Sequence, residues 1–220
     1  KLYNKKRHKS DAFQILLSIL YHHDPEAAGR QQQLEEKIRN MIQFLEISEQ
    51  ESTLLLLFAK VYNIGLLGVP KEITAKRTLL SAEEQAFLRK QAECGYRIAQ
   101  HLKELQPIAE WIYKQHEWWN GQGYPLGLQR DSIPLPSRIM AIARAYTAMT
   151  TPRPPHQAKS HDQALAELRK WAGTQFDPHL IDVFSQLPNN SSEKKQFSSR
   201  CFSPCSISCS TLHTSFRPHR

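Results

Sequence analysis

The chain has 220 residues, of which 40% are hydrophobic, and this length is sufficient for one domain with its own core plus appended segments. The formal net charge of +8 at pH 7 lies at the ends, since residues 1–10 carry +5 and residues 188–220 carry +4, which leaves −1 between them. A nearly neutral middle with basic ends argues against a specific nucleic-acid-binding face, and no apolar run reaches the roughly 18–20 residues that cross a bilayer.

Residues 1–10 are basic and polar, and the apolar stretch after them lacks the small-residue cleavage site of a signal peptide. We interpret them as a linker from a longer protein. A helix is predicted over residues 11–23, where apolar residues recur at helical spacing. These residues are Phe13, Leu16, Leu17 and Leu20. Asp, Pro and Gly within residues 24–29 predict a break, and a second amphipathic helix is expected over about residues 34–45.

A third helix is predicted to begin at Ser48, because Glu51 follows three residues later in the pattern of a capping box. The run 54–58 is apolar all round, so this helix is expected to lie at the centre of the domain. Residues 63–65, Asn-Ile-Gly, are expected to end it, and a loop containing Pro70 should follow.

A second capping box, Ser81 with Glu84, predicts a helix that runs to about Leu102. Pro107 is expected to start the next helix. Residues 119–136 are dense in Gly and Pro and predict a long, ordered loop.

The remaining helices are expected over residues 137–151, 160–171 and 177–184. The second of these helices begins with a capping box, in which Gln163 follows Ser160 by three residues. The third begins with Asp177 as the cap and Pro178 at the first helical position. No segment has the alternation of a strand, so the predicted fold class is all-α.

Residues 188–220 lack any apolar period and are rich in Ser, Cys and basic residues, which predicts a disordered tail. Three cysteines and a histidine in this tail have spacings near those of zinc ligands: Cys201, Cys205, Cys209 and His213. The composition around them favours the disordered tail over a zinc site.

The most informative segment is residues 115–125, Gln-His-Glu-Trp-Trp-Asn-Gly-Gln-Gly-Tyr-Pro. It resembles the HD-GYP family signature HHExxDGxGYP. The resemblance continues in register through residues 127–139 and 153–154 to residues 172–178. It implies an all-α, HD-type helical bundle with a long Gly/Pro-rich GYP loop, in which residues 1–10 are a basic linker and residues 11–187 a degenerate HD-GYP domain.

The resemblance also implies a function. Active HD-GYP proteins use a cluster of two or three metal ions, often iron or manganese. They hydrolyse the bacterial second messenger cyclic di-GMP and usually follow receiver, PAS or GAF sensor domains. A cytoplasmic location, in cyclic di-GMP or two-component signalling, is therefore expected.

The metal-ligand positions that the resemblance assigns are mostly occupied by unsuitable side chains. The His-Asp pair that gives the family its name falls on Tyr62 and Asn63, as in a YN-GYP-type variant. Four further ligand positions fall on Arg30, Gln91, Gln115 and Arg144, and His116 alone retains a ligand. We therefore expect no catalytic residue, no metal and no other cofactor.

Arg144 is expected to take the place of a metal ion and to pair with Glu117 or Asn63, since its guanidinium repels divalent cations. Two other groups resemble catalytic pairs: His22 or His23 with Asp24, and His116 with Glu117. We interpret the first as a solvated helix end. The second lacks a recognisable nucleophile or third group.

Three functions remain open. The first is a catalytically inactive signalling module that binds a protein partner, either a GGDEF-type diguanylate cyclase domain or an upstream sensor or receiver domain. The loop side chains predicted for that contact are Trp118, Trp119, Gln122 and Tyr124, although they could instead only hold the loop in place. The second is a cyclic di-GMP receptor that does not cleave its ligand, with Arg153 contacting a phosphate. The third is an active phosphodiesterase with altered metal ligands.

Overall fold

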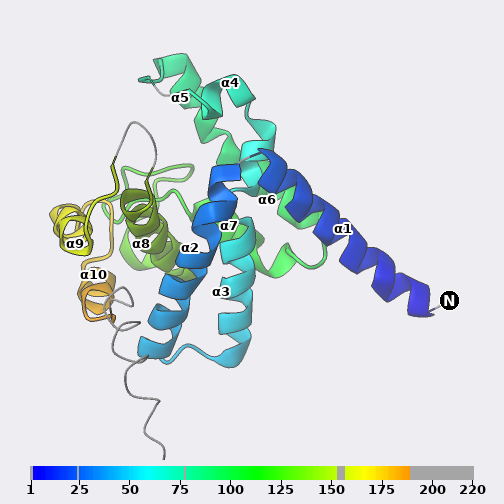
Figure 1. Cartoon of the computed structure of the whole chain (residues 1–220), viewed down its shortest axis with the longest axis horizontal. Coiled ribbons are helices and arrows are strands. Elements are labelled where there is room, and N and C mark those ends of the chain that lie inside the picture. Colours follow the sequence, from blue (N-terminus) through cyan, green and yellow to red (C-terminus); the bar gives the residue numbers. More distant parts are fainter. Residues whose placement is uncertain (1, 24, 77, 153–156, 189–220) are drawn as a thin grey trace, which may run out of the picture. The chain divides into compact units, whose positions relative to one another are not determined.

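The computed structural model describes residues 2–23, 25–76, 78–152 and 157–188, with side chains given from residue 13 onward and not for residues 25–28. Contacts divide the chain into a compact unit of residues 1–187 and a second unit of residues 188–220, of which Pro188 alone is described. The helices are α1 (Leu2–His23), α2 (Pro25–Phe44), α3 (Glu49–Val61), α4 (Lys71–Thr74), α5 (Ala82–Arg89), α6 (Gln91–His101), α7 (Ala109–Lys114), α8 (Leu135–Thr150), α9 (His161–Lys170) and α10 (Pro178–Ser185) (Figure 1). Three 3₁₀ helices join them: η1 (Ile64–Gly68), η2 (Gln106–Ile108) and η3 (Arg130–Ser132).

The described residues contain helices and isolated β-bridges but no strand, so the predicted all-α class is confirmed. The capping boxes at Ser81 and Ser160 are present, and the Asp177 carboxylate caps α10 by accepting from the main-chain N–H groups of His179 and Leu180. These caps satisfy N–H groups that a helix start leaves without partners.

The predicted break between the first two helices is confirmed, since α1 ends at His23 and a separate helix begins at Pro25, but the break does not extend to Gly29. α2 begins at Pro25, because a proline suits the first helical position, and Gly29 lies within the helix. Residues 2–10, which their sequence predicts to be a linker, belong to α1, since this helix begins at Leu2. The single helix expected from Ser81 to Leu102 is divided into α5 and α6 at Lys90.

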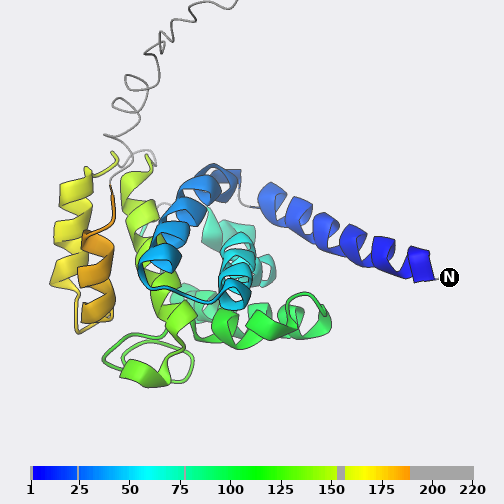
Figure 2. The ribbon, with the colours of Figure 1, turned by 90° about the horizontal axis from the view of Figure 1, so that it is seen from below.

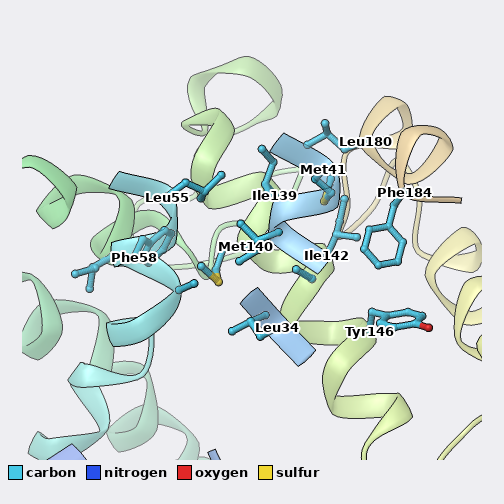
Figure 3. Close-up of a cluster of buried hydrophobic side chains, with 14 of the residues drawn as sticks. Leu34, Met41, Leu55, Phe58, Ile139, Met140, Ile142, Tyr146, Leu180 and Phe184 are labelled. Carbon is cyan, nitrogen blue, oxygen red and sulfur yellow. The ribbon is translucent and has the colours of Figure 1, made fainter. Parts of the chain in front are cut away.

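The core forms around α8, as Figure 3 shows. Ile139, Met140 and Ile142 of α8 are fully buried. They pack with side chains from α2, α3 and α10, among them Leu34, Met41, Leu55, Phe58, Leu180 and Phe184. Burial of one such side chain stabilises the fold by roughly 1.5–3 kcal/mol, so α8 is held rigidly on three sides.

Within the described part of the chain, the helical stretch Glu49–Gly68 has the length and composition of a membrane span. The uninterrupted apolar runs of the sequence had not indicated such a span. In the structure it is divided into α3 and η1, and Leu55, Phe58 and Ala59 are buried in the core. The prediction of a central third helix is therefore confirmed.

Residues 115–134 follow α7 and lead into α8 as a loop whose one helical turn is η3 (Figure 2). The loop is pinned to the turn after α9, because the main-chain N–H groups of Trp119 and Asn120 donate to the carbonyl oxygens of Gln175 and Thr174.

Candidate functional site

Three helix ends meet beside the middle of α8. The end of α3 provides Tyr62 and Asn63, and the first residue of α6 is Gln91. Gln115 and His116 follow α7, and Arg144 extends from α8. The structure therefore brings these predicted positions into one site, although they come from separate parts of the sequence.

Two glycines allow this convergence. A Cβ atom on Gly65, in η1, would overlap the main-chain carbonyl of Gln91. A Cβ atom on Gly95, in α6, would lie 3.3 Å from the Cα atom of Gly65 and 2.9 Å from a methyl carbon of Ile112. The absence of side chains at both positions lets α6 pack directly on η1 and α7.

Arg144 and His116 form the central contact. Nη1 of Arg144 donates to Nδ1 of His116 over 3.3 Å. Burial, and to a lesser extent the charge of Arg144, lower the pKa of His116 well below 6.5, so the imidazole is neutral. Burial also lowers the pKa of Arg144, although a guanidinium remains charged in proteins.

Tyr124 of the loop covers the other face of this pair. Its ring stacks on the His116 imidazole with centroids 4.8 Å apart and planes inclined by 7°. Its hydroxyl accepts from Nε2 of Gln91 over 3.1 Å, and the Arg89 guanidinium lies 5.5 Å from its ring centroid. Burial raises the pKa of Tyr124, so the phenol stays protonated. Tyr124 thus closes the site.

Gln115 acts as a brace. Its Nε2 atom donates to the carbonyl oxygens of Tyr62 at 2.7 Å and of Ile112 at 3.1 Å. Its buried Oε1 atom has no hydrogen-bond partner. An amide at this position therefore ties the end of α3 to α7, where the resemblance implies a metal-binding imidazole.

The expected pairing of Arg144 with Glu117 or Asn63 is wrong. The Glu117 carboxylate accepts instead from the main-chain N–H groups of Leu126 at 2.6 Å and of Leu128 at 3.0 Å. Nδ2 of Asn63 is buried without a partner. Glu117 consequently holds the loop. Because its carboxylate is engaged by these two hydrogen bonds, it is not available to act with His116 in acid–base chemistry.

A pocket of about 490 Å³ opens beside Arg144. Tyr62, Asn63 and Gln91 form part of its wall. Its basic lining residues come from α1, α2, α4, the segment after α4 and α8: His23, Arg30, Lys71, Lys76 and Arg144. Among the described residues that line it, none is Asp or Glu. The described part of the pocket wall is therefore cationic.

Sequence reasoning missed the contribution of Lys71 and Lys76, because residues 70–76 were expected to be a loop. Pro70 could have indicated the short helix α4, since it precedes this helix and serves as its N-cap residue. Lys76 is paired with Glu84 at 2.7 Å, whereas Lys71 forms no ion pair with the described residues.

The residues present do not fit a cluster of iron or manganese. No three His, Cys, Asp or Glu side chains in the described ranges lie close enough to hold a metal ion. Around His116 the neighbouring groups are a guanidinium, a phenol and two amides, of which none is a good ligand for these ions. The Nδ1 lone pair of His116 is also engaged by a cation.

The four loop residues predicted to bind a partner have different surroundings. Tyr124 lies in the site, while Gln122 is exposed. The half-buried Trp118 meets the edge of Trp171 with centroids 6.2 Å apart. Trp119 lies under the guanidinium of Arg138, 5.6 Å from its ring centroid.

Two predicted contacts lie outside the described residues. Arg153, expected to contact a phosphate, is one, and Asp24, the acidic member of the pair with His22 or His23, is the other.

Comparison with known proteins adds to this geometry. A family model described as an HD domain matches residues 14–180. A cyclic di-GMP phosphodiesterase of Thermotoga maritima is 32% identical over 131 residues, which cover 59% of this chain and 36% of that protein. A cyclic di-GMP phosphodiesterase of Vibrio cholerae is 32% identical over 176 residues, covering 73% of this chain and 36% of the relative. A 3′3′-cGAMP-specific phosphodiesterase of the same species is 31% identical over 139 residues, covering 62% and 27%. The chain thus spans about a third of the length of the curated relatives it matches.

A crystal structure of a cyclic GMP-AMP specific phosphodiesterase from Vibrio cholerae has a similar fold. The TM-score is 0.57 at 22% sequence identity, and the match covers 77% of this chain and 45% of the other. At this identity the likeness concerns the arrangement of helices.

Proposed function

The chain belongs to the HD domain family, and we propose that it is a catalytically inactive member that works as a signalling module. Its setting is bacterial cyclic di-GMP or two-component signalling, and its output is a contact with another protein. The relatives with similar sequences are phosphodiesterases of cyclic dinucleotides. In this chain the fold is kept and the hydrolytic step is lost.

One observation carries the proposal, namely the contact between Arg144 and His116. Hydrolysis by a metal cluster requires ions that polarise the phosphate and lower the pKa of a bound water. A guanidinium within hydrogen-bond distance of the remaining imidazole repels a divalent ion at that position. Asn63, Gln91 and Gln115 supply amides, which lack the negative charge that such ions need nearby.

The partner is a GGDEF-type diguanylate cyclase domain or an upstream sensor or receiver domain. The support is two exposed apolar side chains, Leu126 in the loop, which is 53% exposed, and Trp171 after α9, which is 42% exposed. Trp118 lies against Trp171 and provides a second aromatic ring there. Exposed aromatic residues on an ordered surface are the kind of side chain that contributes most to protein–protein affinity.

A second candidate function is a cyclic di-GMP receptor that does not cleave its ligand. The cationic lining of the pocket favours it, since phosphodiester groups are anionic and bind to Arg and Lys. The third candidate, hydrolysis with altered metal ligands, would need carboxylates or imidazoles that the described residues do not bring to this site.

The test is a metal and activity measurement on the purified chain. We expect no stoichiometric iron or manganese by elemental analysis, and no linear product from cyclic di-GMP when Mn²⁺ or Fe²⁺ is added. An HD-GYP phosphodiesterase with intact ligands, assayed in parallel, is the positive control. Two metal ions per chain, or turnover of cyclic di-GMP, would contradict the proposal.

A further inference from the structure

The pocket beside Arg144 contains this half-buried cation, and the described residues supply no counter-charge to it. The one hydrogen-bond partner of the Arg144 side chain is the neutral imidazole of His116, and no carboxylate of the described residues pairs with it. The nearby groups that interact with its charge are the phenols of Tyr124 and Tyr62. A buried charge that lacks an opposite charge is costly, so an anion from solution would stabilise this arrangement.

Asn63 supplies a second, independent observation. Its side chain is 8% exposed, it lines the same pocket, and its Nδ2 donor is buried with no hydrogen-bond partner. Buried donors are nearly always satisfied in folded proteins. A donor left free beside an uncompensated guanidinium therefore indicates that an acceptor atom of a ligand belongs between them.

The third contribution comes from Lys71 at the start of α4. It lines the pocket, forms no ion pair with the described residues and remains exposed. Arg144, Asn63 and Lys71 reach the pocket from α8, the end of α3 and α4, so their donors come from three elements. The pocket wall also has an apolar part, formed by Leu34, Leu66, Leu80 and Leu88.

We propose that this pocket binds a small phosphate-bearing anion directly, without a metal ion, and that Arg144 supplies the positive charge. Phosphate oxygens accept hydrogen bonds from guanidinium, ammonium and amide donors together. The volume of about 490 Å³ is within the usual range for small-molecule sites, and the leucines suit an organic group attached to the phosphate. This inference rests on the proposed function, because it requires that no metal cluster occupies the site.

The test measures binding by titration calorimetry to the full chain after treatment with a chelating resin. Three probes separate the sources of the phosphate: inorganic phosphate, guanosine 5′-monophosphate and cyclic di-GMP. We expect at least one of them to bind without added metal. A probe that carries a base and binds more tightly than inorganic phosphate identifies a nucleotide, whereas equal binding identifies the phosphate alone.

Variants locate the site. Asn63→Asp keeps the shape of the side chain but adds a negative charge, and we expect the affinity to fall about tenfold or more. Arg144→Gln should have an effect at least as large, with its folding checked by circular dichroism. Lys71→Ala is an exposed substitution that leaves the core unchanged, and it should weaken binding several-fold. Lys103→Ala is the matched control, since it removes one positive charge from an exposed position outside the pocket.

The inference is overturned if none of the three probes binds to the metal-free chain, or if Lys71→Ala and Lys103→Ala weaken binding equally. Hydrolysis is recorded on the same samples to separate the two proposals. Absence of both binding and hydrolysis overturns the anion site and leaves the inactive module standing. Binding that appears only with Mn²⁺, together with a linear product, overturns both.

Discussion

Nη1 of Arg144 lies 3.3 Å from Nδ1 of His116, so the one imidazole left among the expected metal-ligand positions is bonded to a guanidinium. Tyr124 stacks on the face of the same imidazole. The three side chains come from α8, the residue pair after α7 and the loop, and together they fill the centre of the site. At the positions where the resemblance implies metal ligands, these side chains instead contact one another.

Arg144→Asp should not produce phosphodiesterase activity, because Tyr62, Asn63, Gln91 and Gln115 remain unsuited to metal. It should also lower the free energy of unfolding by about 1–3 kcal/mol, since it removes the donor to His116 and leaves a shorter side chain. Urea denaturation and a cyclic di-GMP assay with Mn²⁺ measure the two effects. Turnover of cyclic di-GMP by this single variant would refute the inactive-module proposal.

Acidification should destabilise the domain through His116. Its pKa in the folded chain lies well below 6.5, mainly because of burial, so the unfolded chain takes up a proton that the folded chain excludes. The stabilisation is therefore complete above about pH 6.5 and is lost as the pH falls towards the folded pKa. The melting temperature of the unmodified chain should decrease between pH 7.5 and 5.5 more steeply than that of His116→Gln. Parallel curves would show that His116 does not contribute.

Two glycine substitutions should have opposite effects. Gly65→Ala should lower the melting temperature, because its Cβ atom would overlap the carbonyl of Gln91 and push α6 away from η1. Gly29→Ala lies in α2 with no atom within 4 Å of the added carbon, and it should stabilise the chain by up to about 1 kcal/mol through helix propensity. Thermal melts of both variants are the measurement, and a harmless Gly65→Ala would contradict the tight packing of α6.

Mutations should distinguish a side chain that binds the partner from one that only holds the loop in place. Trp171→Ala should weaken binding to a GGDEF-type domain with little change in melting temperature, since Trp171 is 42% exposed. Tyr124→Ala should lower the melting temperature, because it removes the stack on His116 and the bond from Gln91. Pull-down and thermal melting on the same proteins measure both. Unchanged partner binding in Trp171→Ala would rule out this surface.

Removal of residues 189–220 should leave the melting temperature within a few degrees. Leu187 is the last buried apolar residue of the described chain, and it packs in the core near the end of α10. The sequence after it has no apolar period that would extend this core. Calorimetric melting of the shortened chain is the check, and a loss of many degrees would mean that the tail is part of the folded domain.

The sequence by itself determined the all-α class and the starts of α5, α9 and α10, because capping is a local matter of a Ser or Asp next to the first turn. The resemblance to a family signature also predicted which positions lack the imidazoles and carboxylates of metal ligands, since residue types can be compared with a motif without a structure. Gly29 was expected to belong to the break before the second helix but lies inside α2, because a glycine is tolerated within a helix at a modest cost.

Only the tertiary structure decided what replaced the lost contacts. Arg144 pairs with His116 and not with Glu117, because the loop folds back and places two N–H groups on the Glu117 carboxylate. Lys71 reaches the same pocket although it is 73 positions away from Arg144 in the sequence. A hydrogen bond requires its donor and acceptor to lie within about 3.5 Å of each other. Distances on that scale between separate helices depend on how the helices pack, which cannot be read from spacing along the chain.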